Sequence, residues 1–367
     1  MTGLDGMPEA ASVVALHCSL GSGRQWTKLA AALGGYRFMA PDISGYGVAA
    51  IGRDWPRTLD GEIALLEPWL AKAEGPIHLI GHSYGGAIAF RMATASPHAQ
   101  RIRSLTLIEP VLPTLLRDES SRKSSLFEHD PVGKPLHTFP DHAVREASSR
   151  SNSLFEHDPR ANAPRACREG QPPRPFPDHT LLDSPADARL YERFARTAHI
   201  VSQDIFDGAV MEAVEAFTAF WAGSGPREQF SPSGRLRMIE QADKLPYDFN
   251  AALDLDGVAA AARGLGVPTL LLSGGLSPYV TQRIVAKLAL LIDGAELRHL
   301  PAAGHMLPVT HAERVNPEIL RHIWRAEELA KLQLAADAGA ANAAAGTVQP
   351  AGPARPHLVF RRPSFWE

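Results

Sequence analysis

The chain has 367 residues, 45% of them hydrophobic, so it is long enough for one large domain with an insertion or for two ordinary domains. A formal net charge of −3 gives no overall positive field for nucleic acid, and two cysteines, Cys18 and Cys167, are too few for a disulfide framework or a metal site. Residues 1–12 do not read as a secretion signal and no apolar run approaches the ~18 residues that cross a bilayer, so we expect a cytoplasmic protein without a membrane partner.

The first third of the chain alternates short apolar runs with helical patterns. Predicted strands lie at residues 12–18, 37–40 and 103–109, and another begins at residue 77; predicted helices lie between them at 24–33 and 59–73, and a third ends near residue 96. Strands that alternate with helices at this spacing form parallel sheets with helices on both faces. The pattern therefore predicts an α/β fold.

The third strand runs into Ile-Gly-His-Ser-Tyr-Gly-Gly at residues 80–86, and small and apolar residues follow at helical spacing. Gly81 and Gly85 are the positions where a sharp turn from strand to helix leaves no room for a Cβ, and Ser83 stands at its apex. Such a turn exposes a serine hydroxyl at the carboxyl edge of the sheet, at a helix N-terminus. The alternative is a chance match in a glycine-rich loop, and the flanking strand and helix argue against it.

The alternation stops between residues 111 and 262. Residues 125–131, Ser-Leu-Phe-Glu-His-Asp-Pro, recur at 153–159, and two such units are too few for a solenoid. We expect residues 113–182 to be a flexible or poorly packed low-complexity insertion, because their polar, proline-rich composition buries little surface. Apolar positions at helical spacing predict that residues 183–262 form a helical cap inserted between two strands.

The alternation resumes with strands at 267–274 and 296–300 and helices at 279–292 and 311–336. The predicted core therefore combines residues 1–112 with residues 263–336. Residues 337–367 are rich in alanine, glycine and proline, and we expect them to be disordered.

A serine hydroxyl becomes a nucleophile when a base accepts its proton and a carboxylate orients that base. Because the loops that follow parallel strands meet at one edge, the candidates are residues just past a strand. His305 fits best, since it follows the final strand. The other candidates are better explained as structural residues: His82 beside the serine, His17 at the first strand's end, His299 within a strand and His311 at a helix start.

The carboxylate is harder to place. The loop after the strand at 267–274 contains no acid, and the nearest downstream acid, Asp293, lies at the far end of a helix. Glu109 ends the strand next to that of the serine, so its side chain can face His305. We assign Glu109 the orienting role, with a buried structural carboxylate or a solvated loop residue as the alternative. The backbone N–H groups of Tyr84 and Ser19 are the candidate oxyanion donors.

These motifs resemble the α/β-hydrolase superfamily over residues 12–110 and 265–325. Residues 81–86 match the family's nucleophile elbow, the sharp strand-to-helix turn that carries the serine. Residues 17–19 stand where many members have His-Gly, residues 41–47 are similar to the family's Asp-x-x-Gly-x-Gly loop, and residues 304–306 match its histidine loop. The first strand corresponds to the family's third, which implies a mostly parallel sheet of about six strands without the antiparallel edge hairpin.

The resemblance also bears on the acid. Ser277 stands where the family's catalytic Asp is usual. Some haloalkane dehalogenases of the superfamily carry their acid at the position of Glu109, which favours Glu109 independently. Those enzymes use an Asp nucleophile, whereas this chain has Ser83, so dehalogenation is not implied.

Together, the residues and the resemblance predict a carboxylesterase-like serine hydrolase that cleaves an ester or related acyl bond of a small to medium substrate. Ser83, His305 and Glu109 would form its catalytic triad, and Ser19 and Tyr84 its oxyanion hole. No cofactor, metal or nucleic acid is expected, and the oligomeric state is open. The alternatives are acyl transfer or C–C bond hydrolysis on the same triad, or a non-catalytic ligand-binding protein of this fold.

Overall fold

The computed structural model describes residues 11–49, 52, 54–117, 184–225 and 230–345. Six strands form one sheet in the order β2-β1-β3-β4-β5-β6, and every neighbouring pair is parallel. The strands are β1 (Ser12–Leu16), β2 (Arg37–Met39), β3 (Ile77–His82), β4 (Ile102–Ile108), β5 (Thr269–Gly274) and β6 (Glu296–Leu300). The predicted α/β fold with about six parallel strands is confirmed.

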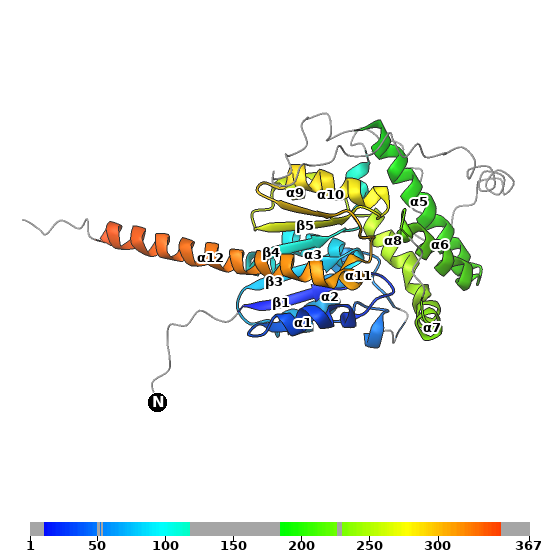
Figure 1. Ribbon diagram of the computed structural model, residues 1–367, viewed down its shortest axis with the longest axis horizontal. Coiled ribbons are helices and arrows are strands. Elements are labelled where there is room, and N and C mark those ends of the chain that lie inside the picture. The colour runs from blue at the N-terminus through cyan, green and yellow to red at the C-terminus, as the bar shows by residue number, and fades with distance from the viewer. Residues whose placement is uncertain (1–10, 50–51, 53, 118–183, 226–229, 346–367) are drawn as a thin grey trace, which may run out of the picture.

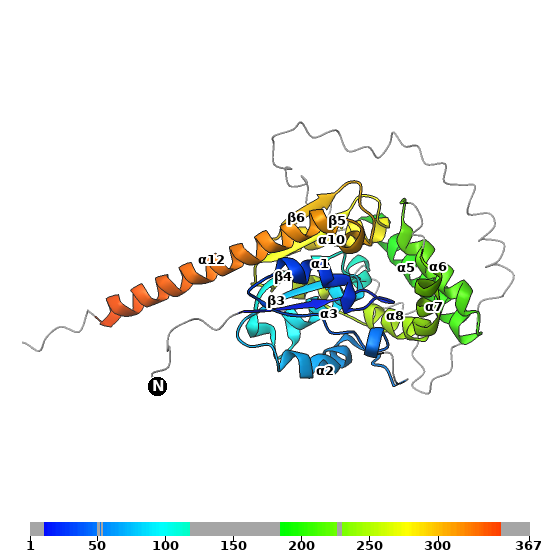
Figure 2. The same ribbon diagram turned by 60° about the horizontal axis from the view of Figure 1, so that its bottom comes forward.

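Helices cover both faces of this sheet (Figures 1 and 2). Side chains alternate along each strand, so Val13 and Ala15 pack towards α1 and α12, whereas Val14 and Leu16 pack on the opposite face, towards α2, α3 and α10. These layers and their connections comprise α1 (Thr27–Ala32), α2 (Leu59–Leu70), α3 (Tyr84–Ala95), α9 (Val258–Arg263), α10 (Tyr279–Leu291), α11 (Leu307–Thr310) and α12 (Ala312–Ala345).

Helix α12 is longer than the sequence led us to expect. We expected disorder from residue 337, but the helix continues to Ala345, and its last turns project past the amino ends of the strands (Figures 1 and 2). The physical reason is composition: alanine, which suggested low complexity, is also the strongest helix former. Residues 346–367 lie outside the described part of the chain.

Within the described residues, five α-helices separate β4 from β5 in the sequence, and the first four of them are inserted helices that lie beyond the carboxyl ends of the strands (Figures 1 and 2). A serine-aspartate capping box, formed by Ser184 and Asp187, starts the first of them. None of the helices in the described ranges is both long and apolar enough to cross a membrane. The inserted helices are α5 (Pro185–Phe206), α6 (Val210–Ala222), α7 (Pro232–Gln241) and α8 (Leu245–Leu253).

The boundary of the expected low-complexity insertion differs from the structure at its start. We placed it at residue 113, but a short 3-10 helix, Pro113–Leu116, belongs to the packed core, with Leu115 and Leu116 buried. The internal repeat itself lies outside the described residues. The division of the chain into core, insertion and cap stays a prediction.

Backbone crowding shapes the turn between β3 and α3. A Cβ on Gly81 would lie 2.3 Å from the carbonyl oxygen of Gly85, and a Cβ on Gly85 would lie 2.4 Å from that of His17. Ser83, between them, has φ 57° and ψ −118°, a backbone conformation that residues other than glycine rarely adopt. The two glycines are therefore required by sterics, as the sequence pattern predicted.

We predict that Gly81→Ala destabilises the protein by about 3 kcal/mol, because the added methyl meets backbone atoms that cannot move without disturbing the turn. Urea denaturation followed by circular dichroism measures the change. The matched control is Gly34→Ala, where a Cβ meets nothing within 4 Å. The control should change the free energy of unfolding by less than about 1 kcal/mol. Equal unfolding midpoints for the two variants would contradict the steric argument.

Candidate active site

The carboxyl edge of the sheet brings together three side chains from three different strand ends. Ser83 follows β3, Glu109 follows β4 and His305 follows β6. His305 Nε2 lies 2.9 Å from Ser83 Oγ, and His305 Nδ1 lies 2.6 Å from Glu109 Oε2. An ionised carboxylate only accepts, so Nδ1 carries the proton that it donates to Glu109, and Nε2 is left to accept from the serine hydroxyl. All three side chains are buried.

Glu109 is held firmly in this position. Its Oε1 accepts from the backbone N–H of Gly274 at 2.7 Å, and its Oε2 also accepts from the Thr281 hydroxyl at 3.3 Å. The rival acid of the sequence analysis, Asp293, is exposed at the far end of α10. Ser277 is buried, and its hydroxyl has no hydrogen-bond partner within the described ranges. Only Glu109, of these candidates, reaches His305.

Backbone strain gathers at this edge. Within the described residues, three non-glycine residues have a positive φ: Leu20 at 56°, Ser83 at 57° and Glu109 at 43°. Each such conformation costs roughly 1–3 kcal/mol and persists where the surroundings enforce it. All three strained residues belong to loops that border Ser83.

The two candidate oxyanion residues line the same small pocket as Ser83. Tyr84 is the first residue of α3, so its N–H has no acceptor within the helix. The neighbouring N–H groups are already used, since Ser83 donates to the carbonyl of Ile108 and Gly85 to that of His17. Ser19 lies on the opposite loop, after β1. The pocket therefore has Tyr84 and Ser19 on its polar side.

The other wall of this pocket is apolar and comes largely from the inserted helices. Trp221 of α6 stacks on the imidazole of His305, with ring centroids 4.3 Å apart and planes 19° from parallel. This contact covers one face of His305 and restricts its rotation. In the sequence, Trp221 is one of the apolar positions at helical spacing from which the cap was predicted, and nothing there indicates a contact with His305. The apolar lining residues are Val111, Phe217, Trp221, Leu245 and Phe249.

Two other histidines hold the loops around the site. His82 Nε2 donates to the backbone carbonyl of His305 at 2.8 Å, and its Nδ1 accepts from the Gln25 amide at 3.1 Å. Burial, with a smaller contribution from His305, lowers the pKa of His82 well below its usual value. His17 accepts from the N–H of Ile43 at 2.8 Å, and burial lowers its pKa as well. Both rings are therefore neutral structural groups.

A buried charged network lies beside the pocket. Lys244 Nζ donates to Glu62 Oε1 at 2.5 Å and to Asp248 Oδ1 at 2.6 Å, and all three side chains are at least 95% buried. Burial alone would lower the pKa of Lys244, but the two carboxylates outweigh burial and raise it. The pKa of Glu62 is raised, chiefly by burial. Sequence analysis missed this network, because such residues usually lie on the surface.

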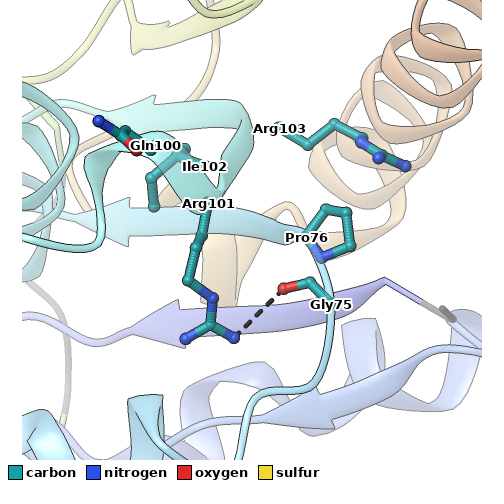
Figure 3. A pocket seen from close by; sticks show the side chains of 6 residues that line it. All are labelled: Gly75, Pro76, Gln100, Arg101, Ile102 and Arg103. Carbon is teal, nitrogen blue, oxygen red and sulfur yellow. Dashed lines mark hydrogen bonds between the residues drawn. The ribbon is translucent and has the colours of Figure 1, made fainter. Parts of the chain in front are cut away.

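A separate hollow of about 550 Å³ lies at the opposite edge of the sheet, near the starts of β3 and β4 (Figure 3). The Arg101 guanidinium donates to the Gly75 carbonyl at 3.2 Å there. The hollow contains none of the residues around Ser83. In open parallel sheets ligands bind beyond the carboxyl ends of the strands, so this hollow is not the candidate active site.

Comparison with known proteins agrees with this fold. A family model described as "alpha/beta hydrolase fold" matches residues 11–312. MenH from S. aureus has a TM-score of 0.55 and 16% identity, over 87% of this chain and 95% of that one. A haloalkane dehalogenase, the DbeA-M1 loop variant from Bradyrhizobium elkanii, has a TM-score of 0.54 and 17% identity, over 89% and 93%. At such identities the likeness shows the fold alone.

A sequence relative is the lipase LipV of Mycobacterium tuberculosis (strain ATCC 25618 / H37Rv). It is 33% identical over 103 residues, which cover 28% of this chain and 38% of the lipase. The chain therefore matches well under two thirds of the length of that relative.

We predict that Lys244→Met destabilises the protein by about 3–5 kcal/mol at pH 7, because it leaves two buried carboxylates without their counter-charge. The deficit should shrink towards pH 5. Lys244 lowers the pKa of Glu62, so its loss raises that pKa further. When the pKa of a carboxyl is higher in the folded than in the unfolded protein, the free energy of unfolding falls as the pH rises from the unfolded-state pKa to the folded-state pKa. Urea denaturation at both pH values measures the deficit.

The control for this prediction is Lys28→Met, which removes an exposed lysine of α1. Its effect should stay within about 0.5 kcal/mol at both pH values. A Lys244→Met deficit that is equal at pH 7 and pH 5 would contradict the assignment of the cost to ionised carboxylates.

Proposed function

The chain belongs to the alpha/beta hydrolase fold family, and from this premise we propose that it is a serine hydrolase that cleaves an ester or a related acyl bond. The observation that carries the proposal is the buried hydrogen-bond chain from Ser83 through His305 to Glu109. A nucleophile, a base and an orienting carboxylate in hydrogen-bond reach are the requirements for acyl transfer through a serine.

In the proposed first half-reaction, His305 Nε2 accepts the proton of Ser83 as Oγ attacks the carbonyl carbon of the substrate. The resulting oxyanion is stabilised by the N–H groups of Tyr84 and Ser19. When the tetrahedral intermediate collapses, His305 returns the proton to the leaving alkoxide, which departs as an alcohol. Glu109 stays ionised and stabilises the imidazolium.

The second half-reaction repeats these steps with water. His305 takes a proton from a water molecule, whose oxygen attacks the acyl-enzyme carbonyl. Collapse of the second intermediate breaks the bond to Ser83 Oγ and returns the proton to it, releasing a carboxylic acid. Trp221, stacked on His305, would keep the ring in the plane that both steps require.

We further infer that residues 183–262 act as a cap that selects the substrate. The support is that Phe217, Trp221 and Phe249 of the inserted helices line the pocket at Ser83. The aromatic and aliphatic side chains on this wall of the pocket favour an apolar acyl group. The match to the lipase LipV is consistent with ester chemistry.

The proposal predicts that a fluorophosphonate probe labels Ser83 and that the protein hydrolyses short and medium p-nitrophenyl esters. Peptide mass spectrometry of the labelled protein locates the adduct. Ser83→Ala should abolish labelling and lower kcat by roughly 10⁶-fold, which for most assays is loss of signal. The control is Ser96→Ala, which changes a serine at the far end of α3 and should keep full activity. A folded wild-type protein that takes no label would overturn the proposal.

The role of Glu109 gives a separate prediction. Glu109→Gln should lower kcat by up to roughly 10⁴-fold, because the amide no longer fixes the tautomer of His305. The matched control is Ser277→Ala, at the place where the family usually carries its acid; its hydroxyl has no partner in the described structure, so kcat should change less than about twofold. Steady-state ester hydrolysis measures both. If Glu109→Gln keeps the wild-type kcat, another group orients His305.

A further inference from the structure

The side chains of the two candidate oxyanion residues both end on buried carboxylates. The Ser19 hydroxyl donates to Asp248 Oδ2 at 2.5 Å, and the Tyr84 hydroxyl donates to Glu62 Oε1 at 3.3 Å. Ser19 lies in the loop after β1 and Tyr84 is the first residue of α3, and the carboxylates come from two other helices, α8 and α2. The backbone N–H groups of Ser19 and Tyr84 are the candidate oxyanion donors, and the side chain of each residue is anchored by a hydrogen bond to a buried carboxylate.

Lys244 joins these two anchors into one unit. Its ammonium contacts Asp248 and Glu62, so a single buried cation links the side chains behind both donors. Further donors complete the carboxylates: Tyr46 donates to Asp248 at 2.5 Å, and Ser44 donates to Glu62 at 2.8 Å. Each of the four carboxylate oxygens therefore accepts at least one hydrogen bond, which fixes the orientation of both groups.

The network also connects the inserted helices to the core. Asp248 belongs to α8, and Lys244 is the residue immediately before that helix. Ser19, Tyr84 and Glu62 belong to the core. Asp248 itself lines the pocket at Ser83. Leu20, next to Ser19, is one of the strained residues, with φ 56°, so this loop needs an external hold. The anchor of Ser19 therefore depends on the position of α8.

We propose that Lys244, Asp248 and Glu62 are positioning residues that aim the N–H groups of Ser19 and Tyr84 at the oxyanion. The oxyanion hole is then complete only while α8 packs against the core. This inference rests on the proposed function, because it assigns a role within the same acyl-transfer site. It does not require the network to stabilise the protein, and buried ion pairs are weak evidence for stability.

The test uses three variants of the full chain: Ser19→Ala, Tyr84→Phe and Asp248→Asn. Each keeps the backbone donors but removes or weakens an anchor. We expect kcat for a p-nitrophenyl ester to fall about 10–100-fold in Asp248→Asn and Ser19→Ala, short of the 10²–10³-fold lost with an entire oxyanion donor. Tyr84→Phe, which loses the longer bond, should lose less. KM should stay within about twofold, since the donors act mainly in the transition state.

A second readout addresses the oxyanion hole directly. An alkylboronic acid forms a tetrahedral adduct with a catalytic serine and imitates the intermediate. Its inhibition constant should rise in proportion to the loss of kcat in each variant. The double variant Ser19→Ala/Asp248→Asn should have the same kcat as Asp248→Asn alone, because both substitutions act on the same hydrogen bond, the one between Ser19 and Asp248.

Asp187→Asn is the matched control. Asp187 is also a buried carboxylate of an inserted helix that is paired with cations of the core, through Arg283 at 2.6 Å and Lys287 at 3.1 Å, and it is not among the residues lining the pocket. This variant should unfold at a lower temperature while keeping kcat within about twofold. A general loosening of the inserted helices would instead lower kcat in both variants.

The outcomes separate this inference from the proposed function. If the wild type hydrolyses esters and Ser83→Ala does not, but Ser19→Ala, Tyr84→Phe and Asp248→Asn keep the wild-type kcat, the positioning role is wrong and the hydrolase stands. Equal losses of kcat in Asp187→Asn and Asp248→Asn would also overturn it. If Asp248→Asn does not fold, the kcat values of Ser19→Ala and Tyr84→Phe test the positioning role, because these variants keep the charges of Lys244, Asp248 and Glu62. A wild type without activity would count against the proposed function itself.

Discussion

The close approach of backbone around Gly81 and Gly85 is the constraint on which the rest of the site depends. It forces the chain to turn sharply between β3 and α3 and holds Ser83 at a positive φ. Two backbone hydrogen bonds join this turn to the end of β4. The N–H of Ser83 donates to the carbonyl of Ile108, and the N–H of Val111 donates to the carbonyl of Ser83. The strained backbone of Glu109 lies between these two bonds, so the turns at Ser83 and Glu109 support each other.

Much of this arrangement could be read from the sequence, for a physical reason. The four central strands, β1, β3, β4 and β5, are buried on both faces and appear as short apolar runs, and the crowded turn admits only glycine at two positions. Parallel topology then brings the strand ends to one edge, so Glu109 and His305 could be named from their places after β4 and β6. Glu109 was reached partly by elimination, because the loop after β5 has no acid. The structure brings its carboxylate within 2.6 Å of His305.

Other features of the site could not be read in this way. Trp221 and Asp248 come from the inserted helices, whose packing on the core is set by contacts between residues far apart in the chain. Lys244 and Asp248 stand four residues apart, a spacing that usually indicates an exposed ion pair on a helix. Their burial depends on Glu62, 182 positions away from Lys244. Residues 337–345 were predicted to be disordered but are helical, because an alanine-rich composition is typical both of low-complexity segments and of stable helices.

The inserted helices therefore do more than cover the pocket. One supplies the ring that stacks on His305, and another supplies the carboxylate that holds Ser19. The core alone contains the side chains of the candidate triad, but the surroundings that fix the ring of His305 and the loop of Ser19 come from outside it. Isolated buried ions are costly, whereas a lysine shared by two carboxylates with all four oxygens hydrogen-bonded gives a rigid and directional link. Through such a link, the position of the Ser19 loop depends on how the inserted helices pack against the core.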